Sequence, residues 1–314
     1  MLKEGRLTDR KTWWRVVQVV GAVVLVALAV RSLARNWNDL QSQTIEWKIR
    51  PLWIALSLVI TWGAYAGLIE AWRRVVESLR QRLGYWDAAR ITMVSNLGKY
   101  VPGKVWAIAG AAYLAQQVGV TKTAAVASAI VLQALALASG VILVAILAPG
   151  LQGVPAGYLI GGAALGVAAV GGVVVLCSRR ALDAIQRRLP PSLPRLDPIA
   201  PGVMLAALGV NAAAWCAYGL AFVALTRGVL PEASLPWTLA TSVFTTSYLI
   251  GLLVAFAPGG LGVRESMFVL LLGGPLGVKL AGALALATRV TLTIAELGAA
   301  VPFLLIRSSR GASR

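Results

Sequence analysis

The chain has 314 residues, of which 58% are hydrophobic and 13% are charged, and its mean hydropathy is +0.77. This composition excludes an ordinary soluble domain and a disordered chain, and it predicts an all-α polytopic membrane protein. A formal net charge of +17 would suit a nucleic-acid partner in a soluble protein. In a membrane protein it reports orientation and contact with anionic lipid, so no nucleic-acid partner is expected.

The residue types present also limit the chemistry. The sequence contains no histidine, which excludes His-based catalysis and His metal ligands. Cys177 and Cys216 fall in or at the ends of predicted spans, and they are too few and too buried for a disulfide framework or a metal site. We therefore expect neither a metal nor a cofactor.

Long uncharged runs predict the membrane spans, because about 20 apolar residues cross about 30 Å of hydrocarbon. The first run, 16–30, follows a basic segment without a cleavage site for a signal peptide, so we expect it to remain as a helix. The others lie at 51–69, at 123–178 on both sides of the turn-rich 148–157, and at 198–226 and 233–263, and a last apolar stretch at 280–306 is interrupted by Arg289 and Glu296. Together these runs predict about seven or eight transmembrane helices.

Basic clusters at 3–15, 73–90, 179–195 and 307–314 predict the orientation. The positive-inside rule places such clusters on the cytoplasmic side, so both termini are expected there, in the cytoplasmic (inner) membrane of a prokaryote. The segment 73–90 carries Val75, Val76, Leu79 and Leu83 on one side, and we expect it to lie in the headgroup plane. The proline-rich linker 178–201 joins two helical halves, 1–178 and 202–314, of a single membrane domain, 1–314.

Two proline- and glycine-containing stretches interrupt the apolar pattern. If 73–90 and Lys122 both face the cytoplasm, residues 91–120 must enter and leave the membrane on the same side, which predicts a re-entrant hairpin broken at Pro102-Gly103. The stretch FAPGGLGVRESMF, 256–268, predicts a second re-entrant or broken hairpin. Pro102 and Pro258 are 156 residues apart, about half of the chain, and this spacing favours an internal repeat of either orientation.

The first hairpin has the elements of an anion site. GKYVPGKV, 98–105, differs from a phosphate-binding P-loop because Val105 replaces the hydroxyl residue and no strand precedes it, so nucleotide binding is not expected. Lys99, Lys104 and the helix start after Pro102 still fit the phosphate of a lipid headgroup. In the alternative interpretation, both lysines only anchor the hairpin at the interface.

Charged residues also occur within the last apolar run. Arg289 and Glu296 are seven residues, about two helical turns, apart, so they share a face but are too distant to pair with each other. Each needs another partner, because buried charges in a membrane face the interior of the bundle. We expect them to meet Arg264, Glu265 and the lysine hairpin around one polar groove. The predicted charge partners or proton-coupling groups are Glu265, Arg289, Glu296 and, as a minor candidate, Glu70.

The two hairpin motifs resemble those of the lysylphosphatidylglycerol synthase transmembrane region family. The matching residues are Asn96, Gly98, Pro102, Gly103 and Lys104 in an N-x-G-x-x-x-P-G-K pattern, and Pro258, Gly259, Gly260, Gly262, Arg264 and Glu265 in a P-G-G-x-G-x-R-E pattern. The resemblance implies a flippase-like fold. In some members this region moves an aminoacylated phospholipid between leaflets, and others accompany pathways for polyprenyl-linked sugars or hopanoids. We expect no lipid aminoacylation here, because no soluble aminoacyl-transferase domain follows Arg314.

These features favour a transporter, not an enzyme: a lipid flippase that moves an anionic or phosphate-bearing phospholipid or polyprenyl-phosphate lipid between leaflets. Its expected partners are membrane lipids with phosphate headgroups, with envelope-biosynthesis enzymes as further candidates. The predicted headgroup-binding residues are Asn96, Gly98, Lys99, Pro102, Gly103, Lys104, Pro258, Gly259, Gly260, Gly262 and Arg264.

Two alternatives remain open at the level of sequence. One is a membrane glycosyltransferase, or its integral partner, using Asp39 and Glu46 of an extracytoplasmic loop at 36–47, although the chain contains no D-x-D metal pair. The other is a scaffold without transport activity.

Overall fold

The computed structural model describes residues 48–100, 105–147, 198–253 and 260–305, together with 164, 166–168, 170–172, 175 and 177–187. Within these residues it contains helices and no strand, which confirms the all-α prediction. The segments outside the described residues include both termini, the predicted first span 16–30, the turn 148–157 and residues 188–197 of the linker, along with Pro102, Gly103, Lys104, Pro258 and Gly259.

In chain order, the described helices are α2 (Pro51–Ser78), α3 (Tyr85–Asn96), the 3-10 helix η1 (Leu97–Tyr100), α4 (Val105–Gln117), α5 (Lys122–Leu147), α7 (Arg179–Gln186), α8 (Pro201–Val229), α9 (Trp237–Leu253), α10 (Val263–Leu276) and α11 (Val278–Leu305). Both α2 and α8 begin with proline. The fixed φ of proline suits the first position of a helix, and its lack of an N–H costs no hydrogen bond there, because an N–H at this position has no acceptor within the helix.

Four of these helices are long and apolar enough to cross a membrane: α2, α5, α8 and α11, with 28, 26, 29 and 28 residues. At a rise of about 1.5 Å per residue each extends about 40 Å. In contrast, α9 has 17 residues and α10 has 14, fewer than the roughly 20 that one span requires. The protein is therefore multi-pass, and the predicted total of about seven or eight spans stays a prediction.

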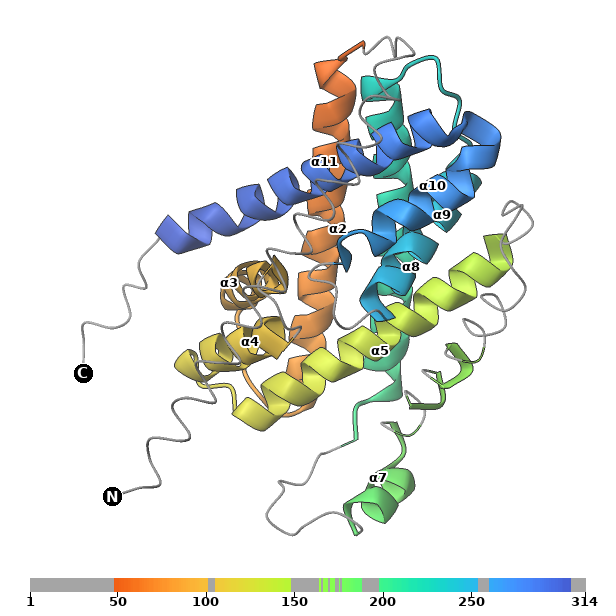
Figure 1. Ribbon diagram of the computed structural model, residues 1–314. Helices are drawn as coiled ribbons and strands as arrows, with labels where there is room; N and C mark the ends of the chain where they lie inside the picture. Colours follow the sequence, from red (N-terminus) through yellow and green to blue (C-terminus); the bar gives the residue numbers. More distant parts are fainter. Residues whose placement is uncertain are drawn as a thin grey trace, which may run out of the picture.

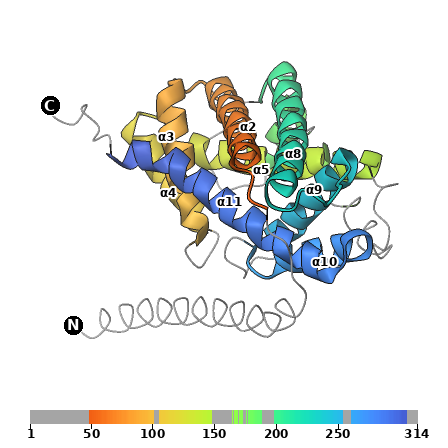
Figure 2. The same ribbon diagram turned by 90° about the horizontal axis from the view of Figure 1, so that it is seen from above.

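The antiparallel pair of α2 and α8 forms the centre of the structure, and α5 and α11 cross this pair obliquely (Figures 1 and 2). The N–H of Arg50, just before α2, donates to the carbonyl of Gly228 near the end of α8, at 2.8 Å. Gly228 allows this close approach: a Cβ there would lie 2.8 Å from the Ile54 side chain. Small residues at helix contacts are typical of membrane bundles, where van der Waals packing supplies much of the association energy.

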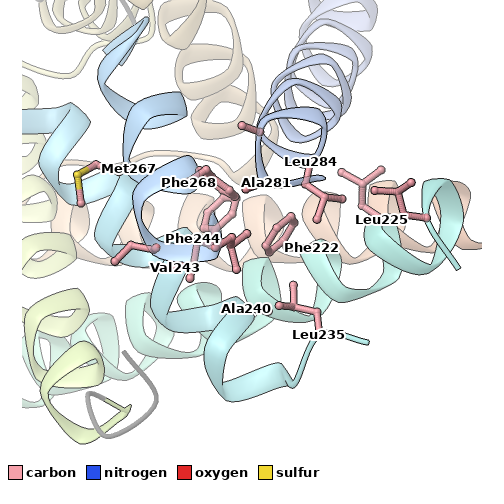
Figure 3. Packing of buried hydrophobic residues seen from close by; sticks show 14 of the residues in the cluster. Phe222, Leu225, Leu235, Ala240, Val243, Phe244, Met267, Phe268, Ala281 and Leu284 are labelled. Carbon is pink, nitrogen blue, oxygen red and sulfur yellow. The ribbon is translucent and has the colours of Figure 1, made fainter. Parts of the chain in front are cut away.

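The largest apolar cluster joins α8, α9, α10 and α11 (Figure 3). Phe222 of α8 and Phe268 of α10 meet edge to face, with their ring centroids 5.2 Å apart. Leu284 of α11 and Val243 of α9 are fully buried in the same cluster. This packing holds the short α9 and α10 against two membrane-length helices, because aromatic and branched side chains from all four elements share one interior.

The prediction that residues 73–90 form one amphipathic segment in the headgroup plane is wrong. Residues 73–78 continue α2, the chain turns at 79–84, and α3 begins at Tyr85. Arg80, with φ 59°, has the left-handed conformation that ends a helix. Val75, Val76 and Leu83 are buried against other helices. Their helical spacing correctly indicated an apolar face, but that face packs inside the protein and not on the membrane surface.

The first predicted hairpin appears as two helices that lie side by side, α3 and α4, connected by η1 and the residues that follow it (Figure 1). It begins at Tyr85, earlier than the predicted 91. The backbone of α4 approaches α3 at Gly110, where a Cβ would lie 3.6 Å from the Ser95 side chain. The re-entrant course of this hairpin stays a prediction.

At the second predicted break, α9 ends at Leu253 and α10 begins at Val263. Gly260 and Gly262 precede α10 with φ of 70° and 80°. Glycine adopts such left-handed conformations without the steric cost that a Cβ imposes, so these two positions allow the chain to turn into α10. The two helices pack against each other, and whether they form a re-entrant hairpin stays a prediction.

Candidate functional site

A cavity of about 550 Å³ lies among α2, α3, α4, α5, α8, α9 and α11. Its polar lining includes Asn96, Lys99 and Glu296. It reaches the surface of the structure between α4 and α5, because Ile108 and Ile130, which also line it, are 41% and 56% exposed. A cavity that holds an ion pair and opens between two apolar helices can admit a charged group while an attached hydrocarbon chain stays outside.

The charged centre of the cavity is an ion pair between Lys99 Nζ and Glu296 Oε1. Glu296 also accepts hydrogen bonds from the hydroxyls of Tyr100, at 2.6 Å, and Tyr65, at 3.4 Å. The side chains of Glu296 and Lys99 are only 7% and 22% exposed. The structure thus brings the first predicted hairpin and the last apolar helix together at one point, where a buried carboxylate has three donors.

Gly98 positions this ion pair. A Cβ at Gly98 would lie 2.9 Å from the backbone nitrogen of Ala107 and equally close to the carbonyl carbon of Trp106. Both atoms belong to the backbone of α4 and cannot move aside as a flexible side chain does. The start of α4 therefore packs directly on η1, which holds Lys99 towards Glu296.

A second ion pair joins α10 and α11. Arg289 Nη1 lies 3.2 Å from Glu265 Oε1, and the other carboxylate oxygen of Glu265 is buried without a hydrogen-bond partner among the described residues. Neither residue lines the cavity. The charges that we expected around one groove thus form two separate ion pairs, and α11 supplies one residue of each. Of these two pairs, Lys99–Glu296 lines the cavity and Arg289–Glu265 does not.

Arg264 lies at the start of α10, and aromatic rings contact its guanidinium group. Its Cζ is 4.8 Å from the ring centroid of Tyr248 and 5.8 Å from that of Phe244. Its side-chain stem passes between two glycines: a Cβ at Gly251 would lie 2.5 Å from Arg264 Cγ, and one at Gly260 would lie 3.1 Å from it. Arg264 makes no ion pair with a described carboxylate, and a cation over aromatic faces is stabilised by their π electrons.

Aromatic side chains connect the cavity with Arg264. Tyr65 of α2 and Tyr218 of α8 are 6.2 Å apart, and Tyr218 stacks on Phe244 of α9 at 5.3 Å. Trp215 meets Tyr248 at 5.2 Å, and all five rings line the cavity. This aromatic wall has no signal in the sequence, since its members come from three helices and share no period. Gly251 also has no such signal, because only the position of Arg264 shows why a glycine is needed there.

The other predicted residues have different surroundings. Glu70 accepts hydrogen bonds from Arg73 and Arg74 on its own helix, each at 2.7 Å, and it does not line the cavity. Asn96 lines the cavity, whereas Gly260 and Gly262 shape the turn before α10. The roles predicted for Pro102, Gly103, Lys104, Pro258 and Gly259 fall outside the described residues.

The fold and the cavity define a helical, multi-pass membrane protein with an ion-paired, aromatic-lined site within its bundle. The family described as Lysylphosphatidylglycerol synthase TM region matches residues 15–297, and the chain belongs to it. This family is a membrane domain of lipid-related proteins. A comparison with curated proteins finds no match.

Proposed function

We propose that this protein is a lipid translocase that moves an anionic or phosphate-bearing lipid between the leaflets of the membrane. The observation that carries the proposal is the cavity of about 550 Å³ with Lys99 and Glu296 in its lining. Charged residues inside a membrane bundle are costly, and they mark the paths of substrates and ions. The lipid-related family of the chain makes a lipid headgroup the best-supported substrate.

In this proposal the headgroup enters the cavity while the acyl or prenyl chains remain in the bilayer. The phosphate is held by Lys99, and Asn96, whose amide is a hydrogen-bond donor, lines the same cavity. The opening beside Ile108 and Ile130 gives the hydrocarbon chains an apolar exit. Arg264, beyond the aromatic wall, does not line the cavity and is a separate cation on the proposed path of the headgroup, and the sequence offers Lys104 as a further candidate.

We further propose that the arginine-rich end of α2 faces the cytoplasm of a prokaryotic cell. Arg73 and Arg74 lie near the end of α2, and Arg90 lies in the following helix. The positive-inside rule assigns such a cluster to the cytoplasmic side. The first hairpin, which follows this cluster, then starts from the cytoplasmic leaflet, and a lipid made in the cytoplasm meets the cavity from that side.

The experiment that tests the function is a leaflet-exchange assay in proteoliposomes with fluorescent phosphatidylglycerol and a fluorescent polyprenyl phosphate. The decisive variant combines Lys99→Gln with Glu296→Gln, because it removes the cation without leaving an unpaired buried carboxylate. Its matched control combines Lys48→Gln with Glu232→Gln, a pair of exposed residues outside the cavity.

We expect the wild-type protein and the control to accelerate exchange. The cavity variant should be slower by about tenfold or more, the equivalent of one lost hydrogen bond to a charged group. A wild-type protein that accelerates the exchange of neither lipid would reject the proposal.

A further inference from the structure

Among the described residues, Lys99 and Glu296 are the charged side chains that line the cavity, and they already neutralise each other. A phosphate that binds Lys99 therefore brings a second negative charge next to the Glu296 carboxylate. Two anions then share one ammonium group beside a carboxylate whose side chain is only 7% exposed, and like charges in contact with each other disfavour the ionised state of one of them.

Among the described residues, Lys99 is the cation that forms an ion pair with Glu296. The 3-10 helix η1 contributes Lys99 and Tyr100, α2 contributes Tyr65, and α8 contributes Tyr218. The amide of Asn96 on α3 is neutral. On α11 itself Arg289 is paired with Glu265 of α10, and Arg264 of α10 lies over the rings of Tyr248 and Phe244.

A proton resolves this conflict. The hydroxyls of Tyr65 and Tyr100 donate to the Glu296 carboxylate in the free protein. A hydroxyl oxygen also accepts hydrogen bonds, so after slight rotation the same groups can accept one from a carboxylic acid. Glu296 therefore keeps polar partners in both protonation states, whereas its charge has a counter-ion only when Lys99 is not bound to phosphate.

We propose that an anionic lipid headgroup binds Lys99 together with the uptake of one proton by Glu296, so that the protein carries lipid and proton as one neutral unit. The inference rests on the proposed function. The proton comes from the water at the cavity opening, forms the O–H bond of the Glu296 carboxylic acid, and returns to water on the other side when the headgroup leaves and Lys99 pairs with Glu296 again. Movement of such a unit responds to a pH gradient and not to the membrane potential.

Glu296 is a better proton acceptor for this role than the other predicted carboxylates. Glu265 keeps Arg289 as its counter-ion and does not line the cavity, so a headgroup at Lys99 leaves its surroundings unchanged. Glu70 keeps Arg73 and Arg74 at the end of α2. Only Glu296 loses its counter-ion to the proposed substrate.

The test counts protons during binding. Purified full-length protein in a non-ionic detergent is titrated with dioctanoyl phosphatidylglycerol, whose phosphodiester stays singly charged through the neutral range. Calorimetry in two buffers with different ionisation enthalpies gives the number of protons taken up per lipid. We expect about one for the wild-type protein, with an affinity that falls by up to about tenfold per pH unit as the pH rises, because the complex holds one proton more than the free protein.

Two variants assign the proton to its residue. Glu296→Gln should bind the lipid without proton uptake and without dependence on pH, whereas Glu232→Gln, a change at an exposed residue that does not line the cavity, should behave as wild type. If Glu296→Gln does not fold, Glu296→Asp replaces it and should retain the uptake.

The possible results separate this inference from the function on which it rests. Lipid binding by the wild-type protein without proton uptake overturns the proton coupling but leaves lipid transport intact. The absence of any lipid binding overturns both.

Discussion

Single residues set the chemistry of the cavity by their contacts with other helices. Glu296 holds donors from η1 and α2, and Arg264 passes between Gly251 of α9 and Gly260 before its guanidinium meets the rings of Tyr248 and Phe244. The cost of a buried charge explains why each has such contacts. Gly251 has no Cβ, and the side-chain stem of Arg264 occupies the space where a Cβ would lie.

Gly251→Ala tests this packing of Arg264. The new Cβ would lie 2.5 Å from Arg264 Cγ, so the arginine must move, and overpacking of this kind costs about 1–3 kcal/mol. We expect a lower unfolding midpoint in detergent and slower lipid exchange. Gly209→Ala, in α8, is the control: its Cβ meets nothing within 4 Å, and alanine favours a helix by up to about 1 kcal/mol. Equal stability of the two variants would contradict the packing.

Among the structural elements, the hairpin of α3, η1 and α4 brings Lys99 to the cavity. Its function depends on the close approach of α4 to η1 at Gly98, and α11 supplies Glu296 from the other side. Because η1 and α11 are far apart in the chain, the site exists only when the hairpin is docked. Hairpin docking and lipid transport should therefore be lost together.

Gly98→Ala should undock the hairpin in part. A Cβ 2.9 Å from the Ala107 nitrogen pushes two backbones apart, with a cost of about 1–3 kcal/mol, and separates Lys99 from Glu296. The expected result is faster amide hydrogen exchange in α3 and α4 together with slower lipid exchange. Gly63→Ala, in α2, where a Cβ meets nothing within 4 Å, should change neither. Unchanged hydrogen exchange in Gly98→Ala would show that the hairpin does not depend on this contact.

Sequence patterns predict the elements better than the contacts between them. Apolar runs located α2, α5, α8 and α11, and the charges within the last run correctly indicated that Arg289 and Glu296 needed other partners. The identity of one partner was not predictable, because Lys99 is 197 residues away from Glu296. The same limit explains the error at 73–90: the apolar spacing of Val75 and Val76 shows a buried face but does not say whether lipid or protein covers it.

For the whole molecule, membership of a lipid-related membrane family and the cavity that opens between α4 and α5 lead to the same proposal. The cavity has an ion pair at its polar end, a wall of aromatic rings and an opening beside apolar side chains. These three features correspond to the three parts of a phosphate-bearing lipid: its charge, its headgroup and its hydrocarbon chains. The central claim is that the headgroup crosses the membrane through this cavity.

Filling the cavity tests that claim most directly. Ala111 of α4 lines the cavity, whereas Ala109 of the same helix is exposed and does not line it. The measurement is the rate of leaflet exchange of fluorescent phosphatidylglycerol in proteoliposomes that contain equal amounts of Ala111→Trp or Ala109→Trp protein, each first shown to be monodisperse. We predict that Ala111→Trp abolishes the accelerated exchange and that Ala109→Trp exchanges lipid as the wild type does. Wild-type exchange by folded Ala111→Trp protein would contradict the claim, because the headgroup would then cross by another route.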